Sequence, residues 1–312
     1  MRCRFRDAGH ILGSAIIELW LQEGERARKL VFSGDLGQPG RPIVRDPTPI
    51  DEADLLFVES TYGDRVHRPM RETVDELVAV IEDTLRRHQG NIDIPAFALG
   101  RTQELLYLLV SLRRENRLPP MQVFVDSPIA DKVNAITARH PEFLDAETRE
   151  MLSLRRQPPE GLSIRFTKNV DESMALNRLK AGGIIVAASG MCDAGRIKHH
   201  PRHNLGRPEC AIVIIGFQAE GTLGRRLVDG EKRVRLFGEE HAVRASVHTI
   251  GGLSAHADRD ALLAWLRSLR RAPQQTFVLH GEAATACGFA DRIADELGWA
   301  AEGPAALSHV DL

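Results

Sequence analysis

Several acidic residues and histidines occupy positions where they could act together chemically. Three short apolar runs end at or just before such a residue, and these residues are Asp35, Glu59 and His280. His10 lies between two glycine-containing turns in DAGHILG, and His256 lies in GGLSAHAD, whose small residues permit close approach of a substrate. Imidazole nitrogens and carboxylate oxygens suit zinc, so His10, Asp35 and His280 are candidate ligands. Each residue taken singly could instead be a cap or a turn residue, and only their convergence favours the chemical role.

The elements that must position these residues alternate between strands and helices along much of the chain. β-Branched and aromatic runs followed by Gly or Pro predict buried strands that end near Asp35, Glu59, Asp126, Ser189, Gly216 and His280. Apolar residues at helical spacing predict helices over 71–87, 101–114 and 259–269. This alternation indicates an α/β fold with a largely parallel central sheet, whose carboxyl edge is where ligands bind. The strands of the first 60 residues follow one another without helices, which predicts antiparallel or mixed pairing.

A second group of candidates forms a basic segment, SGMCDAGRIKHHPRHN, at residues 189–204. Between Arg196 and Arg207 the chain carries four Lys or Arg side chains, three histidines and no acidic residue. One interpretation is a solvated basic loop. The other is a patch that contacts RNA phosphates, preceded by a Ser-Gly turn at Ser189 whose amides and hydroxyl can hold a phosphate. No aromatic residue interrupts the segment, so contacts to the RNA backbone are expected to outweigh base stacking.

Composition limits what the chain can be. Its 312 residues suffice for two domains or one large α/β unit, and its net charge of −2 means that a nucleic-acid surface must be a local patch. The four cysteines form no CxxC pair, which indicates structural thiols in a reducing compartment, and we expect a cytoplasmic protein. No apolar run approaches the ~18 residues of a membrane span. Charged residues interrupt the N-terminal apolar stretch, which argues against a signal peptide.

Together these segments resemble the motifs of the β-CASP branch of the metallo-β-lactamase superfamily, the RNA-processing nucleases related to the cleavage and polyadenylation endonuclease. DAGHILGSA and SGDLG are similar to the third and fourth metal motifs of the family. This similarity implies that His10 is a zinc ligand and that Asp35 bridges two zinc ions. ESTYGD, GGLSAHAD and VLHGE resemble motifs A, B and C, carried here by Glu59, His256 and His280, the last a further zinc ligand. The motifs stand in the family's order along essentially the whole chain.

The resemblance also implies a division into domains and a set of RNA contacts. It predicts a partial metallo-β-lactamase (αββα) domain over residues 1–64 and 241–312, with an inserted β-CASP α/β domain over 65–240 that carries a mainly parallel sheet. FALGRTQELL and SGMCDAGRIKHH are similar to family segments as well. From these segments the residues expected to contact RNA are Arg101, Ser189, Arg196 and Lys198.

One family motif does not occur in this chain. The first metal motif, His-x-His-x-Asp-His, would precede His10, and no such string is present anywhere. In the family that motif supplies the remaining ligands of a two-zinc site. Zinc takes about four ligands per ion, so His10, Asp35 and His280 cannot hold two ions in the family geometry, and partial or weak zinc binding is expected. Loss of the N-terminal half of the family's sheet would also leave an exposed sheet edge.

The activity implied by the resemblance is zinc-dependent hydrolysis of RNA phosphodiester bonds, in which two metal ions activate a water for in-line attack on phosphorus. His256, oriented by Glu59, would stabilise the charge on the phosphate or protonate the leaving oxygen. No additional domain follows in the sequence, which by family analogy favours the compact endonuclease type. The RNA target, the distinction from exonucleolytic cleavage and the oligomeric state, a homo-oligomer included, are left open.

Three hypotheses follow. The first is a β-CASP RNA hydrolase shortened at its N-terminus by the choice of start codon, by expression design or by natural truncation. The second is a non-catalytic RNA-binding or partner subunit of an active homologue. The third, a hydrolase of small esters or thioesters, is disfavoured by the β-CASP segments between Glu59 and His256. An open frame upstream of Met1 that encodes His-x-His-x-Asp-His would favour a misplaced start, and a stop codon would favour a short chain. For the chain as given we expect sub-stoichiometric zinc and little nuclease activity.

Overall fold

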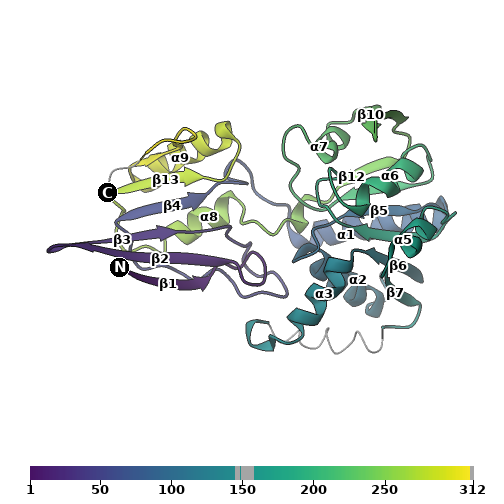
Figure 1. The fold of residues 1–312 in the computed structure, drawn as a ribbon, viewed down its shortest axis with the longest axis horizontal. Helices are drawn as coiled ribbons and strands as arrows, with labels where there is room; N and C mark the ends of the chain where they lie inside the picture. The colour runs from purple at the N-terminus through teal and green to yellow at the C-terminus, as the bar shows by residue number, and fades with distance from the viewer. Residues whose placement is uncertain (145–147, 149–157, 310–312) are drawn as a thin grey trace. The chain divides into compact units, whose positions relative to one another are not determined.

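The structure is a computed structural model that describes residues 1–144, 148 and 158–309 (Figure 1). The chain forms two compact units, one made of Met1–His67 with Ala255–Leu312 and the other of Arg68–Ser254. The predicted domain limits fell after residues 64 and 240. Residues 241–254 lie with the second unit, because strand β12 (Ser246–Thr249) pairs with β9 (Ala211–Ile214) in that unit's sheet.

A six-stranded mixed sheet forms the first unit, in the order β1-β2-β3-β4-β13-β14. β1, β2 and β3 pair antiparallel, whereas β3, β4, β13 and β14 pair parallel, so the expected mixed pairing is confirmed. As a result β1, β3, β4 and β13 run in one direction and their carboxyl ends meet at one edge. The elements of this unit are β1 (Arg2–Asp7), β2 (Ala15–Glu23), β3 (Arg26–Phe32), β4 (Leu55–Glu59), β13 (Gln275–Leu279), β14 (Ala301–Glu302), α8 (Arg259–Leu266) and α9 (Ala283–Leu297).

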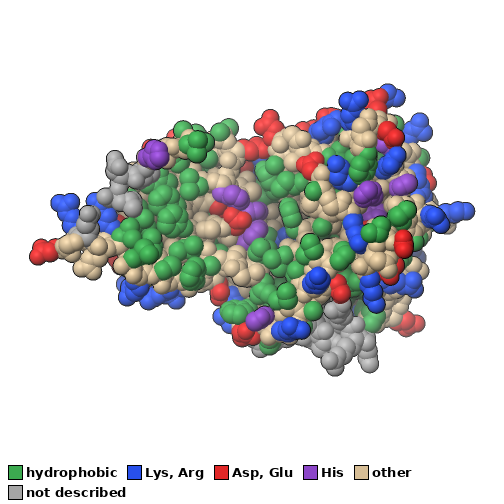
Figure 2. All heavy atoms as spheres, viewed as in Figure 1, with side chains coloured by type: hydrophobic (Ala, Val, Ile, Leu, Met, Phe, Trp, Pro, Cys, Tyr) green, Lys and Arg blue, Asp and Glu red, His purple; other side chains and the backbone are tan. Residues whose placement is uncertain are grey.

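The two faces of this sheet pack differently. Alternate strand residues such as Val31 and Val278 join apolar residues of α8 and α9 in the main core of the unit. Their sequence neighbours point to the opposite face, where Phe32 stacks on Phe57 at 4.4 Å between ring centroids and Phe57 on Phe277 at 5.0 Å. Figure 2 shows hydrophobic side chains gathered over these strands. β1 is an edge strand with exposed side chains, as the sequence predicted.

The second unit is built on a six-stranded sheet in the order β12-β9-β5-β8-β6-β7. Every pair in it is parallel, which confirms the predicted α/β fold with a parallel sheet. A separate antiparallel hairpin, β10 (Arg233–Leu236) and β11 (Glu239–Ala242), stands outside it. The remaining strands are β5 (Ile92–Pro95), β6 (Met121–Asp126), β7 (Leu162–Phe166) and β8 (Gly183–Ala187).

The helices of the second unit follow the apolar periodicity of the sequence. The predicted helix over 71–87 is α1 (Met70–Glu82), which continues as a π-turn at Asp83–Arg87, and its apolar stripe packs in the largest core. The predicted helix over 101–114 is α2 (Arg101–Arg114). The others are α3 (Pro128–Thr137), α5 (Val170–Leu176), α6 (His199–Asn204) and α7 (Leu223–Val228), with 3-10 turns at Pro141–Phe143, Arg196–Lys198 and Gly251–Leu253. Within the described ranges, no helix has the length and apolar character needed to cross a membrane.

Candidate metal centre

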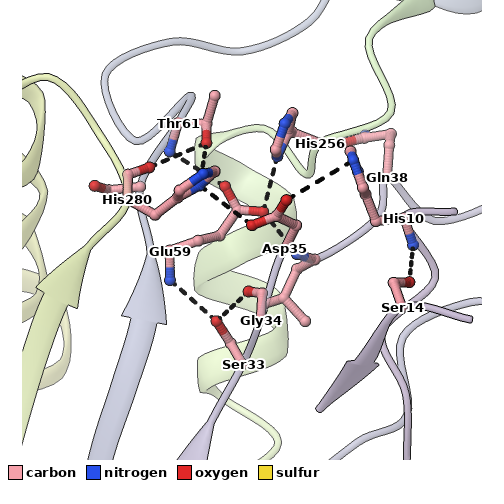
Figure 3. Close-up of polar contacts among 12 residues, drawn as sticks. His10, Ser14, Ser33, Gly34, Asp35, Gln38, Glu59, Thr61, His256 and His280 are labelled. Carbon is pink, nitrogen blue, oxygen red and sulfur yellow. Dashed lines mark hydrogen bonds and ion pairs between the residues drawn. The ribbon is translucent and has the colours of Figure 1, made fainter. Parts of the chain in front are cut away.

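Four candidate residues lie where strands of the first unit end at the same edge. His10 follows β1, Asp35 follows β3, Glu59 is the last residue of β4 and His280 follows β13 (Figure 3). His256 reaches this edge on the loop before α8. That loop is held by two backbone hydrogen bonds, from the residue-38 amide to the residue-255 carbonyl and from the residue-257 amide to the residue-36 carbonyl, both 2.8 Å or shorter. The structure therefore brings together all five residues predicted to bind metal or act in catalysis.

The carboxylate of Asp35 lies between two imidazole rings. Its Oδ1 is 3.2 Å from Nδ1 of His280, and its Oδ2 is 4.0 Å from Nε2 of His10. The chain reaches this position through a turn at Gly34, where φ is +56° and a Cβ atom would come within 2.8 Å of the Ala15 carbonyl oxygen. Glycine is thus the residue that this turn accepts. Each carboxylate oxygen therefore faces a different histidine.

Glu59 is buried beneath this edge and holds His256. Its Oε1 accepts a hydrogen bond from the Leu36 amide at 2.6 Å and lies 3.1 Å from Nδ1 of His256. Its Oε2 accepts from the Thr61 amide at 3.2 Å. A carboxylate only accepts, so the imidazole proton lies on Nδ1 and leaves Nε2 available. Because both Glu59 oxygens are engaged, Glu59 is a positioning residue for His256.

The donor set matches the chemistry of zinc. Ligand atoms of His10, Asp35 and His256 lie within 4.8 Å of one another, and the same holds for Glu59, His256 and His280. Nitrogen and oxygen donors of this kind, converging at a strand edge, are typical of hydrolytic zinc sites. Both groups contain His256, and neither contains both His10 and His280, so the set expected from the motifs, His10, Asp35 and His280, is not one compact group of donors in this structure. Because Glu59 is held by hydrogen bonds, these three remain the residues proposed to hold the metal. Three protein donors and a water can complete one catalytic zinc ion but not two, so these residues suit zinc chemically and are too few for a two-ion site.

His67 supports this site, although it belongs to no motif identified from the sequence. Its Nε2 donates to the His256 carbonyl at 3.0 Å, and its amide donates to Asp258 Oδ2 at 2.9 Å. Burial lowers the pKa of His67 below its ordinary value of 6.5, which keeps the ring neutral near pH 7. Asp258 also caps α8 by accepting from the Ala261 amide. His67 therefore links the loop of His256 to the start of α8.

The residues predicted to contact RNA all lie in the second unit, where two of them are engaged internally. Arg101 is buried at the start of α2, pairs with Glu104 and donates to the Leu253 carbonyl. Arg196 donates from Nη1 to Oδ1 of the buried Asp126 at 2.8 Å. Either guanidinium would have to leave its protein partner to bind a phosphate with all its donors. These contacts favour a scaffolding role for both residues.

Ser189 and Lys198 both lie in the segment that follows β8, Ser189 just after the strand and Lys198 in the 3-10 turn at Arg196–Lys198. The Ser189 amide donates to the Ala194 carbonyl at 3.0 Å, and Ser189 is half-buried at the end of β8. Lys198 lies at the end of the 3-10 turn, with Nζ 5.1 Å from the ring centroid of Phe237. No aromatic residue lies within the basic segment itself, but the fold places one beside it. The hairpin β10–β11 supplies one from a distant part of the chain.

Comparisons with known proteins give the family. The Beta-Casp domain matches residues 102–227, and the Zn-dependent metallo-hydrolase RNA specificity domain matches residues 240–304. The chain is 40% identical over 278 residues to a ribonuclease of Thermus thermophilus, an alignment that covers 89% of this chain and 62% of that protein. The chain belongs to the β-CASP family of metallo-β-lactamase-fold RNA nucleases. The resemblance inferred from the motifs is thereby confirmed.

Other β-CASP relatives extend the comparison. The chain is 32% identical to an RNase J-like protein of Methanocaldococcus jannaschii, over 93% of this chain and 66% of that protein. It is 31% identical to transcription termination factor FttA of Pyrococcus abyssi, over 100% of this chain and 49% of that protein. This β-CASP chain thus spans about half to two thirds of the length of the curated relatives it matches.

Proposed function

We propose that this β-CASP chain takes part in zinc-dependent, endonucleolytic hydrolysis of RNA in the cytoplasm. The observation that carries the proposal is the position of the Asp35 carboxylate between His10 and His280, beside the Glu59–His256 pair. The names of the relatives, a ribonuclease, an RNase J-like protein and a transcription termination factor, support RNA as the substrate. The four free cysteines, of which Cys192 and Cys210 are buried, agree with a reducing compartment.

Each residue of the site has a distinct task in this proposal. Zinc held by His10, Asp35 and His280 would supply Lewis-acid activation of water and positive charge at the phosphate. Asp35 presents one oxygen toward each histidine and so sets the spacing of the ligands. Because Nδ1–H of His256 is held by Glu59, Nε2 is the nitrogen left to face the leaving oxygen, and it would donate a proton from the form of the ring that is protonated on both nitrogens.

A second candidate function rests on the number of ligands. His10, Asp35 and His280 are too few to complete two zinc sites. A chain that binds RNA, or an active homologue, without cutting RNA itself would need no further ligands. Under this alternative the chain would bind RNA but would show no zinc-dependent cleavage, even in a complex that supplies the missing donors.

The experiment that tests the proposal supplies the missing metal ligands on a second polypeptide. The chain would be co-expressed with the N-terminal metallo-β-lactamase segment of a family member that carries His-x-His-x-Asp-His, and the co-purified complex would be assayed on RNA labelled at its 5′ end. We expect zinc-dependent internal cleavage, loss of that cleavage in Asp35→Ala and a rate at least about 100-fold lower in His256→Ala. A complex that holds two zinc ions and leaves RNA intact, or cleavage unchanged in Asp35→Ala, would overturn the proposal. Asp291→Asn, on the exposed surface of α9, is the matched control.

A further inference from the structure

An aromatic side chain stands at the tip of the β10–β11 hairpin. Leu236 pairs with Glu239, so Phe237 and Gly238 form a two-residue turn. Both have positive φ, +50° at Phe237 and +84° at Gly238. Two-residue turns of this kind favour Asn or Gly at the first position, because a larger side chain in the left-handed region is strained. Phe237 is therefore a residue that the turn itself does not favour.

Burial does not explain the choice of phenylalanine either. Phe237 is 46% exposed. The alternating residues Val234 and Leu236 of the same hairpin are each 1% exposed and anchor it to the core. A strained backbone position combined with a partly exposed apolar ring points to a role other than folding.

Basic and imidazole side chains of the basic segment surround this ring. The ring of His199 stacks on Phe237 at 4.9 Å between centroids and 29° between planes. Lys198 Nζ lies 5.1 Å and Arg202 Cζ 5.8 Å from the same centroid. Figure 2 shows histidine and basic side chains gathered where Figure 1 places α6. We refer to Lys198, His199, Arg202 and Phe237 as the Phe237 platform.

The charges of the platform are partly balanced. Arg202 Nη2 lies 2.9 Å from Glu239 Oε2, and His241 Nε2 lies 3.8 Å from the same oxygen. Lys198 has no ion pair among the residues that the structure describes, so its charge is available to an anionic ligand. An aromatic ring beside an available ammonium group and a guanidinium is the combination that binds single-stranded nucleic acid, by base stacking and phosphate contact.

We propose that the Phe237 platform binds single-stranded RNA, with one base stacked on the platform's rings and Lys198 contacting a neighbouring phosphate. The proposal rests on the proposed function only in taking RNA as the ligand. It adds a stacking contact within the second unit to a basic segment for which the sequence alone led us to expect mainly contacts to the RNA backbone.

The experiment distinguishes a loss of base stacking from a loss of folding. Replacing Phe237 by a residue that the turn favours should weaken RNA binding without lowering the stability of the chain. Phe237→Asn places a favoured residue in the turn and removes the ring, so its midpoint of thermal unfolding should equal or exceed that of the wild type. Binding of a fluorescein-labelled single-stranded RNA of about 12 nucleotides would be followed by anisotropy. EDTA in the buffer prevents cleavage, which makes the result independent of hydrolytic activity.

We expect Phe237→Asn to weaken RNA binding roughly 5- to 20-fold and Phe237→Trp to bind within about twofold of the wild type. Lys198→Gln should reduce the slope of the logarithm of the binding constant against the logarithm of salt concentration by about 1, the change expected for the loss of one phosphate contact. The matched control is Phe143→Asn, since Phe143 is 44% exposed elsewhere in the same unit, and it should bind as the wild type does.

Wild-type affinity in a folded Phe237→Asn variant would overturn the platform while leaving the proposed ribonuclease function intact. Equal losses in Phe143→Asn and Phe237→Asn would also overturn it, because the effect would then not be specific to the platform. Failure of the wild-type chain to bind the RNA at all would overturn both proposals.

Discussion

Oε1 of Glu59 lies 3.1 Å from Nδ1 of His256, and the Glu59 side chain is only 1% exposed. The two residues are far apart in sequence and meet because β4 ends where the loop before α8 crosses the strand edge. The buried carboxylate fixes both the direction of the imidazole and the nitrogen that carries its proton. The rest of the site is arranged around this pair.

Glu59→Gln should disturb the tautomer of His256. The amide that replaces the carboxylate can donate as well as accept, so the preference for a proton on Nδ1 should weaken. The ring ¹⁵N shifts of His256, measured by NMR, should report mainly the Nδ1–H tautomer in the wild type and a mixture in the variant. Glu25→Gln, at an exposed position of the same unit, should leave the shifts unchanged. A wild-type ring protonated on Nε2 alone would contradict the assignment.

Asp126→Asn should destabilise the second unit strongly. Burial alone would raise the pKa of Asp126, but hydrogen bonds from His200, Ser173, Thr167 and Arg196 lower it well below its ordinary value of 3.8. Replacement leaves the fully buried His200 ring and Arg196 without their anion, at a cost of about 3–5 kcal/mol. Denaturant unfolding at pH 7 measures this cost.

The pH dependence of this effect has a definite sign. A carboxylate whose pKa is lowered by folding contributes stability above its ordinary pKa, and that contribution is lost as pH falls below it. The difference between wild type and Asp126→Asn should therefore shrink below pH 4. The control breaks the exposed Arg225–Asp229 pair with Asp229→Asn, which should cost less than about 1 kcal/mol. Equal costs for the two variants would show that the buried network is not what holds the basic segment.

Asp93 should show the opposite pH dependence. Burial raises its pKa to about 6, and only its Oδ1 is hydrogen-bonded, to Asn204 at 2.8 Å. The unfolded chain then loses this proton at lower pH than the folded chain, so wild-type stability falls relative to Asp93→Asn as pH rises from about 4 to 6. The change in the difference should be on the order of 2–3 kcal/mol, measured by denaturant unfolding at both pH values. A difference independent of pH would mean that Asp93 is ionised in the folded state throughout.

Variants of Arg101 and Lys198 should show which of the two residues stabilises the fold and which contacts RNA. Arg101→Gln removes the guanidinium that pairs with the buried Glu104, so it should lower the free energy of unfolding by about 3–5 kcal/mol. Lys198→Gln should leave stability within about 0.5 kcal/mol and lower RNA affinity instead. Thermal unfolding and anisotropy on the same samples test both expectations. A stable Arg101→Gln variant with reduced RNA affinity would restore Arg101 as a direct contact.

The sequence predicted that the candidate site residues converge, because strand direction decides it. Glu59 ends a strand and His10, Asp35 and His280 follow strands, and parallel strands bring their carboxyl ends to one edge whatever the side chains between them. Runs of β-branched and aromatic residues likewise located strands of both sheets, and apolar residues at helical spacing located α1, α2 and α8. His67 could not be found this way, since its contact is to a backbone carbonyl.

The contacts of the basic segment depended on side-chain directions that no pattern encodes. Arg196 turns inward to Asp126, and Phe237 comes to His199 from a separate hairpin. Arg101 is a partial exception, because Glu104 follows it at a spacing of three on α2, where an ion pair is expected. The second compact unit extends to Ser254 rather than ending at residue 240, because β12 joins its sheet.

Zinc content tests the central claim most directly, namely that this chain carries part of a two-zinc hydrolytic site through His10, Asp35 and His280. The purified chain would be dialysed to equilibrium against buffered zinc, and the zinc bound in excess of that in the dialysate would be measured by plasma mass spectrometry. We predict well below two zinc ions per chain, no retained zinc in Asp35→Ala and wild-type content in Asp291→Asn. Two tightly bound zinc ions per wild-type chain, or zinc content unchanged in Asp35→Ala, would contradict the account.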